Sequence, residues 1–177
     1  MSNYTISKLK TFTGMEGHGF TLTLLRDGKV VAEVRDAAEG GPIHFDWKDF
    51  GKAATVRTVN YKDEPHEFQG TAEEALFYAY CLAQPKHEDF DKVMRHTSPE
   101  MVINGMVNSL LCERRLKRMF KTKLVFIMNG TGYTYPLSAG ESIAALIAEL
   151  KPSRPGAVFL NTLELDAAIP LALAARI

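Results

Sequence analysis

The amino-acid sequence predicts an α+β protein: an N-terminal antiparallel β-meander packed by a central long helix, with a C-terminal ββαβα segment. Three observations support this prediction. Asp27-Gly28 lies between two apolar, β-branched runs, which is the strongest short-range signal for a β-hairpin. Thr71 and Glu74 have the spacing of a helix capping box. Between Ser98 and Lys123 only Gly105 weakens a continuous helical pattern.

The first seventy residues are predicted to form a meander of five or six antiparallel strands. Glycine and proline clusters separate short runs that are rich in β-branched and aromatic residues. The predicted strands cover residues 4–12, 20–25, 29–34, 43–47, 55–61 and 66–69. Such a sheet has one face to bury, and we expect the helices that follow to cover it.

The middle of the chain is predicted to be helical. The first helix begins at the Thr71 cap and ends before Pro85, and its aromatic face is typical of a core rather than of a cofactor site. A weaker helix is expected at about His87 to Arg95. The long helix then begins at the Ser98 cap, with Pro99 in its first turn.

The apolar stripe of the long helix changes face near Cys112. Ile103, Val107 and Leu110 lie on one side, whereas Leu116 and Phe120 lie more than a third of a turn away. Either the helix kinks, or different elements pack against its two ends. We expect residues 1–121 to hold the sheet and helices, and residues 122–177 to form the ββαβα segment. That segment either completes the main core or stands as a small subdomain.

Composition restricts the possible classes of function. The 177 residues include 21 basic and 21 acidic side chains, so zero net charge argues against a general nucleic-acid coat but not against a local basic site. No apolar run approaches the ~20 residues needed to span a bilayer, and the first residues lack the apolar core of a signal peptide. Cys81 and Cys112 lie in apolar helical patterns, which suits a reducing compartment. We therefore expect a cytoplasmic protein without a membrane partner.

A basic run follows the change of face in the long helix. It contains Arg114, Arg115, Lys117, Arg118 and Lys121. Cations at a helix C-terminus complement the helix dipole, so one interpretation is a solvated helix end. The other interpretation is an electrostatic site for phosphate or for an acidic partner.

Motifs for catalysis, cofactors and metals are weak. The glycine loop between Gly14 and Gly19 lacks the spacing and the following helix of a phosphate-binding loop. His44 and Asp46 are two apart on a predicted strand and could supply two metal ligands, with His18, His66 or Glu16 as a third, but no second pair has suitable spacing. His96-Thr97-Ser98 is better explained as the junction before a helix. We therefore predict no catalytic residue, no cofactor and no metal.

The N-terminal segment resembles small uncharacterised accessory proteins of bacteriophages and mobile elements. The likeness lies in the stretch from Ser7 to Gly14, in Gly19-Phe20, and in the run from Leu25 to Val31, and it covers about the first fifty residues. The resemblance implies a role in binding a host protein, in some cases to block a defence system, and a location in the host cytoplasm. It implies no catalytic residue.

Three functional hypotheses follow. The first is a binding protein whose contact surface includes His18 and Trp47, because exposed aromatic side chains anchor interfaces. That surface is lost if Trp47 is buried. The second is a nucleic-acid-binding accessory protein that uses the basic run. The third is a small-ligand site or an active site around His18, His44 and Asp46, which requires the three to converge. An uncovered sheet edge would also favour a homodimer.

Overall fold

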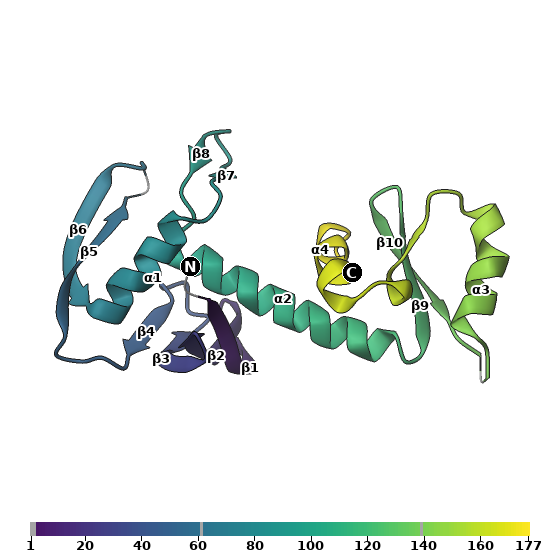
Figure 1. The fold of residues 1–177 in the computed structure, drawn as a ribbon, viewed down its shortest axis with the longest axis horizontal. Helices are drawn as coiled ribbons and strands as arrows, with labels where there is room; N and C mark the ends of the chain where they lie inside the picture. The colour runs from purple at the N-terminus through teal and green to yellow at the C-terminus, as the bar shows by residue number, and fades with distance from the viewer. Residues whose placement is uncertain (1–2, 61, 139) are drawn as a thin grey trace. The chain divides into compact units, whose positions relative to one another are not determined.

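The computed structural model describes residues 3–60, 62–138 and 140–177 and confirms the α+β class (Figure 1). The chain forms two compact units, Met1–Met106 and Val107–Ile177. The division falls inside helix α2 (Pro99–Met119), whereas the sequence placed the boundary between residues 121 and 122. The difference arises because the second half of α2 packs with the C-terminal segment.

The first unit contains a four-stranded antiparallel sheet with the order β1-β2-β3-β4. Its strands are β1 (Tyr4–Gly14), β2 (Gly17–Arg26), β3 (Lys29–Asp36) and β4 (His44–Trp47). The predicted hairpin is confirmed, with Asp27 at φ 51° and Gly28 at φ 78°, the left-handed pair that a type I′ turn requires. β1 is one edge of the sheet, and it carries a bulge between Ser7 and Lys10, a feature that opposes edge-to-edge pairing.

Two further strands do not continue this sheet, contrary to the predicted five- or six-stranded meander. β5 (Ala53–Val59) and β6 (Pro65–Thr71) pair with each other as a separate antiparallel ladder. The loop before β5 is tied to the next helix, because Asp49 Oδ2 accepts a hydrogen bond from Glu73 N at 2.9 Å. The Ala72 amide also donates to the Lys52 carbonyl at 3.0 Å. These bonds lead the chain away from β4 and onto the helix.

Helix α1 (Ala72–Leu82) covers the apolar face of the four-stranded sheet. Its predicted capping box is confirmed: Glu74 N donates to Thr71 Oγ1, and the Glu74 carboxylate accepts from Thr71 N. Phe77 is completely buried, and its ring contacts those of Tyr4 and Trp47 at centroid distances of 5.0 and 5.8 Å. The aromatic face of this helix is therefore core, as predicted.

The second unit contains a three-stranded sheet with the order β10-β9-β11. Its elements are β9 (Lys123–Met128), β10 (Thr131–Pro136), α3 (Ile143–Leu150), the 3-10 turn η1 (Lys151–Ser153), β11 (Val158–Phe159), the 3-10 turn η2 (Leu160–Thr162) and α4 (Leu165–Ala174). The ββαβα order is as predicted. Ser138 and Glu141 have the spacing of a second capping box, but it is only half formed: Glu141 accepts from Ser138 N, whereas α3 begins later, after an N-cap Ser142 without a side-chain bond. Ala139 of that motif lies outside the described residues.

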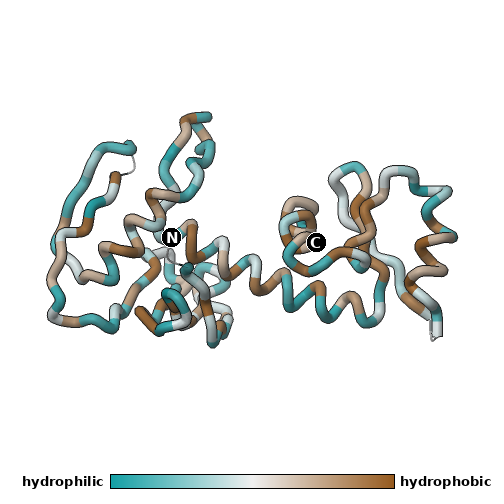
Figure 2. The backbone as a smooth tube through the Cα atoms, in the orientation of Figure 1, coloured by the Kyte–Doolittle hydropathy of each residue, from teal (hydrophilic) through white to brown (hydrophobic). Residues whose placement is uncertain are grey.

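Strand β9 is hydrophobic along its length (Figure 2), and side chains on both of its faces are buried. Val125 packs with Cys112 and Leu116 of α2 and with residues of α4. Leu124 and Phe126, which point to the other side, pack against α3. The second half of α2 is therefore part of this core, which explains its change of apolar face. Within the described residues, none of the helices combines the length and apolar character that crossing a bilayer requires.

Candidate functional site

Residues 87–95 form a β-hairpin and not the helix that the sequence predicted. β7 (His87–Glu88) pairs antiparallel with β8 (Met94–Arg95). The reason is the Asp89 side chain, whose Oδ1 accepts hydrogen bonds from the amides of Asp91 and Val93, each at 2.9 Å. Such local bonds from an Asp to the following amides compete with helix formation. We name residues 86–96 the hairpin arm.

Both the backbone and the side chain of Asp89 stabilise the turn of the hairpin arm. Asp89 N donates to the Val93 carbonyl and Lys92 N donates to the Asp89 carbonyl, each at 3.0 Å. The second carboxylate oxygen of Asp89 accepts from Arg95 Nε at 2.8 Å. The Arg95 bond, reinforced by the Val93 amide, lowers the pKa of Asp89. A charge-assisted bond across two short strands gives the turn a defined shape.

The base of the hairpin arm is clamped by Asp63, which lies between β5 and β6. Asp63 Oδ1 accepts from the His96 amide at 3.1 Å, and its Oδ2 accepts from Lys86 Nζ at 3.0 Å. These two bonds lower the pKa of Asp63, the amide bond contributing more. Thr97 Oγ1 closes the base further by donating to the Pro85 carbonyl at 2.9 Å. One carboxylate therefore holds both ends of the arm.

The clamped hairpin arm presents apolar side chains to solvent. Phe90 is fully exposed, because it follows Asp89 in the turn and none of the described elements packs over it. Val93 and Met94 are 43% and 51% exposed. Figure 1 shows the hairpin projecting beyond the end of α1, and Figure 2 shows hydrophobic residues among hydrophilic ones near its tip. The arm is thus a structured support for an uncovered aromatic ring.

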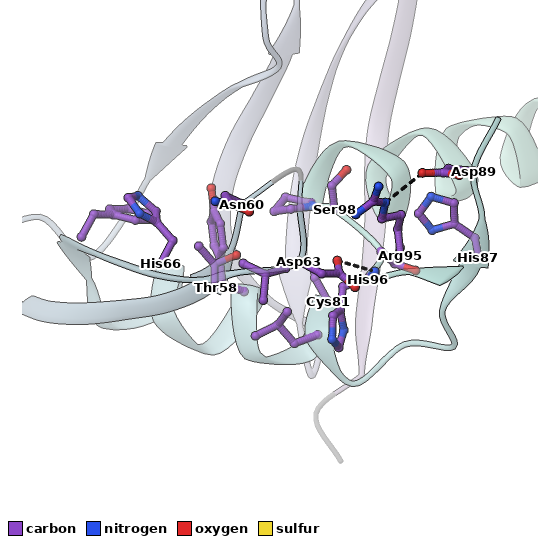
Figure 3. A pocket seen from close by; sticks show the side chains of 16 residues that line it. Thr58, Asn60, Asp63, His66, Cys81, His87, Asp89, Arg95, His96 and Ser98 are labelled. Atoms are coloured by element: carbon purple, nitrogen blue, oxygen red, sulfur yellow. Dashed lines mark hydrogen bonds and ion pairs between the residues drawn. The ribbon is translucent and has the colours of Figure 1, made fainter. Parts of the chain in front are cut away.

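A cavity of about 640 Å³ lies on the other face of the hairpin arm. Side chains alternate along the hairpin, so His87 and Arg95 line the cavity whereas Glu88 and Met94 do not. Figure 3 shows His66 at one end and His87 at the other, with His96 between them. The remaining wall comes from β5, β6 and α1.

The carboxylates and the thiol of this cavity are not free for acid–base or nucleophilic chemistry. Both of its carboxylates, Asp63 and Asp89, are engaged in the ion pairs described above. Burial raises the pKa of the Cys81 thiol to about 12, so it stays protonated and is a poor nucleophile. The Nδ1 atoms of His87 and His96 are buried and lack a hydrogen-bond partner in the described chain. Imidazole nitrogens are therefore what the cavity offers to a ligand.

The structure does not support the predicted protein-binding pair His18 and Trp47. Trp47 is only 5% exposed and packs against Phe45, with the ring centroids 5.4 Å apart. It belongs to the core because β4 turns Phe45 and Trp47 toward α1. His18 is exposed at the start of β2. An interface anchored on Trp47 is excluded by its burial.

His18, His44 and Asp46 do not converge. His44 pairs with Arg35, which pairs with Thr21 of β2, so these three share one face of the sheet. His18 is three residues from Thr21 on the same strand and therefore faces the opposite side. His44 and Asp46 do share a face, where they line a hollow of about 490 Å³. The predicted three-residue site is thus wrong, and no group of His, Cys, Asp and Glu within the described residues is arranged to hold a metal ion.

The predicted basic run lies on the exposed side of the second half of α2 and, for Lys121, in the turn that follows the helix, all in the second unit. Arg114, Arg115, Lys117, Arg118 and Lys121 are all exposed. Lys117 forms an ion pair with Glu113 one turn away. Arg115 and Arg118 line a pocket together with Thr134 and Arg176. Arg176 was not among the predicted residues, because it lies 58 residues beyond Arg118 in the chain and has no motif around it.

Sequence reasoning also missed the hairpin arm and its cavity. His96-Thr97-Ser98 was interpreted as the junction before α2, and Ser98 does cap that helix through the Met101 amide at 3.2 Å. The detectable signal was the pair of acidic residues around Phe90, since Asp favours turns in which its side chain bonds the amide two residues on. Comparison with protein-family models, with curated proteins and with solved structures finds no match to this chain.

Proposed function

We propose that this protein acts by binding a protein partner, with the tip of the hairpin arm as the anchor of the interface. The observation that carries the proposal is the fully exposed Phe90 on a turn held by both oxygens of Asp89. An aromatic side chain on a preorganised turn loses little conformational freedom on binding, which is the property of interface hot spots.

The free energy available from burying Phe90 favours a specific contact over an incidental exposed ring. Burying a Phe side chain stabilises a fold or a complex by about 1.5–3 kcal/mol. Phe90 is not buried within its own chain, so this free energy is available for binding a partner. Val93 and Met94 extend the apolar surface beside it. The ion pairs of Asp63 and Asp89 keep the arm in one conformation, so that binding need not order it.

The charges around the arm indicate the character of the partner. The first unit contains twelve basic and sixteen acidic residues, a net charge of −4. Glu88, Asp91 and Lys92 are exposed around Phe90, so the rim of the tip carries charges of both signs. A partner with an apolar pocket, rimmed by charges of both signs and set in a basic surface, would complement the arm and the acidic first unit. The resemblance of the N-terminal segment to phage accessory proteins makes a bacterial host protein, such as a component of a defence system, the first partner to test.

The proposal is tested by affinity capture from bacterial lysate followed by binding measurements on the purified partner. Phe90→Ala is expected to weaken the complex at least about tenfold, since loss of a central aromatic anchor costs about 2 kcal/mol or more. Phe50→Ala is the matched control, because Phe50 is 76% exposed in the same unit but lies outside the hairpin arm. It is expected to leave the affinity unchanged.

Equal affinity of the wild type and of Phe90→Ala for the captured partner would refute the arm as the contact surface. Light scattering of the purified chain alone distinguishes self-association from binding to a different protein. A dimer that Phe90→Ala dissociates would identify the partner as a second copy of the chain.

A further inference from the structure

A second pocket of interest lies between α2, β10 and the end of α4. Its volume is about 450 Å³, within the range of small-molecule sites. Arg115, Arg118 and Arg176 line it with the Thr134 hydroxyl, and Met119 and Ala175 supply apolar surface. All of these residues belong to the second unit, so the pocket is complete within it.

The arginines of this pocket are not used by acidic side chains. Arg115 and Arg118 are three residues apart on α2 and therefore share a face of the helix. Among residues 3–60, 62–138 and 140–177, none of the ion pairs involves Arg115, Arg118 or Arg176. Within the described residues these three guanidinium groups therefore have no acidic partner in an ion pair, which leaves them open to an anion in the pocket.

Arg176 occupies a backbone position that favours glycine. It follows the end of α4 with φ 56°, and its amide donates to the Leu173 carbonyl at 3.1 Å. The Ile177 amide donates to the Ala172 carbonyl at 3.0 Å, which completes a Schellman motif with Arg176 as its left-handed residue. Glycine adopts this conformation without strain, so the arginine is held there at some cost in stability. Its side chain lines the pocket. A role in binding would therefore explain why an arginine occupies this strained position.

The charge of the second unit agrees with an anionic ligand. It contains nine basic and five acidic residues, a net charge of +4, although the whole chain is neutral. Guanidinium groups bind phosphate oxygens through paired, charge-assisted hydrogen bonds, and the apolar wall can accept a base or sugar.

We propose that this pocket binds the phosphate group of a nucleotide, either free or within a single-stranded nucleic acid. The phosphate would lie against Arg115, Arg118 and Arg176, with Thr134 as a further donor. Arg114 and Lys117, which lie on α2 outside the pocket, would then attract the neighbouring phosphates of a strand. This site is separate from the hairpin arm and does not depend on the proposed protein partner.

The test measures binding of a labelled oligothymidylate by fluorescence anisotropy at salt concentrations between about 50 and 200 mM, and binding of thymidine monophosphate by NMR. Arg118→Gln is expected to weaken binding about tenfold or more and to reduce the slope of log K against log salt by about 0.7. Lys121→Gln is the matched control, because it removes the same charge from the same basic run outside the pocket. It is expected to change affinity no more than about threefold.

Arg176→Gly separates binding from folding. Because glycine suits the left-handed position, this variant is expected to be at least as stable as the wild type while binding about tenfold more weakly. If the oligonucleotide binds, and binding is weakened by Arg118→Gln and Arg176→Gly but not by Lys121→Gln, the ligand is a strand. If only the mononucleotide binds, the ligand is a free nucleotide. Absence of binding to both probes, or equal loss in Lys121→Gln and Arg118→Gln, would overturn the proposal.

Discussion

At the scale of single residues, two carboxylates determine the shape of the hairpin arm. Asp89 closes the turn and Asp63 joins its two ends, and each uses both of its oxygens. Asp63 itself has a left-handed φ of 63°, a conformation that Asp tolerates better than most residues. The exposure of Phe90 is therefore a consequence of polar groups around it.

Tyr4 provides a residue-scale test of the core of the first unit. Its hydroxyl is buried without a hydrogen-bond partner in the described chain, and burial raises the pKa of Tyr4 to about 12. Tyr4→Phe removes this unsatisfied group and keeps the ring contacts with Phe77 and Tyr80. We expect the free energy of unfolding to rise by about 1 kcal/mol in urea titrations followed by Trp47 fluorescence.

The control for Tyr4→Phe is Tyr135→Phe, whose side chain is partly exposed in the second unit; the unfolding of that unit is followed by far-UV circular dichroism. It should change the free energy of unfolding by no more than about 0.5 kcal/mol. Destabilisation by Tyr4→Phe would mean that the hydroxyl makes a favourable interaction, and would contradict its assignment as unsatisfied.

At the scale of elements, the hairpin arm should lose order in acid. Asp63 and Asp89 have pKa values lowered below the usual value of about 3.9 by the bonds that they accept. Their contribution to stability is therefore present above about pH 3.9 and is lost as the pH falls through the lowered values. We expect the amide signals of His96 and Val93, which donate to these carboxylates, to titrate in NMR spectra with midpoints below about 3.9.

Asp63→Asn should remove the acidic step at the His96 amide and leave the step at Val93, because Val93 donates to Asp89. Amide signals that titrate at or above about 3.9 would show that the carboxylates do not hold the arm as described.

The elements that the sequence predicted correctly are those stabilised by neighbours along the chain. The Thr71–Glu74 capping box and the Asp27-Gly28 turn each need only residues within a few positions. The hairpin arm depends on Asp63, which lies 33 residues before His96, and local propensity alone favoured a helix there. For the same reason the sequence predicted the basic residues of α2 but not Arg176, which lines the same pocket and is distant in the chain.

At the scale of the whole molecule, each unit has its own core, and Trp47 fluorescence reports on the first unit alone. Trp47 is the single tryptophan and lies in the first unit, whereas Leu116 is completely buried in the second. Leu116→Ala is expected to lower the free energy of unfolding of the second unit by about 2–5 kcal/mol. Far-UV circular dichroism should then show an early transition that Trp47 fluorescence does not show.

Leu111→Ala, at a partly exposed position on the same helix, is the control and should change neither transition by more than about 0.5 kcal/mol. If both probes shift together in Leu116→Ala, the two units unfold as one cooperative structure through α2.

The unequal charges of the two units have a consequence for how copies of the chain behave in concentrated solution. A neutral polypeptide is ordinarily least soluble because nothing keeps its copies apart. Here the acidic part of one copy also attracts the basic part of another, and mobile ions weaken that attraction over a Debye length of about 10 Å at 0.1 M. Near neutral pH the protein should therefore salt in, dissolving more readily as electrolyte is added.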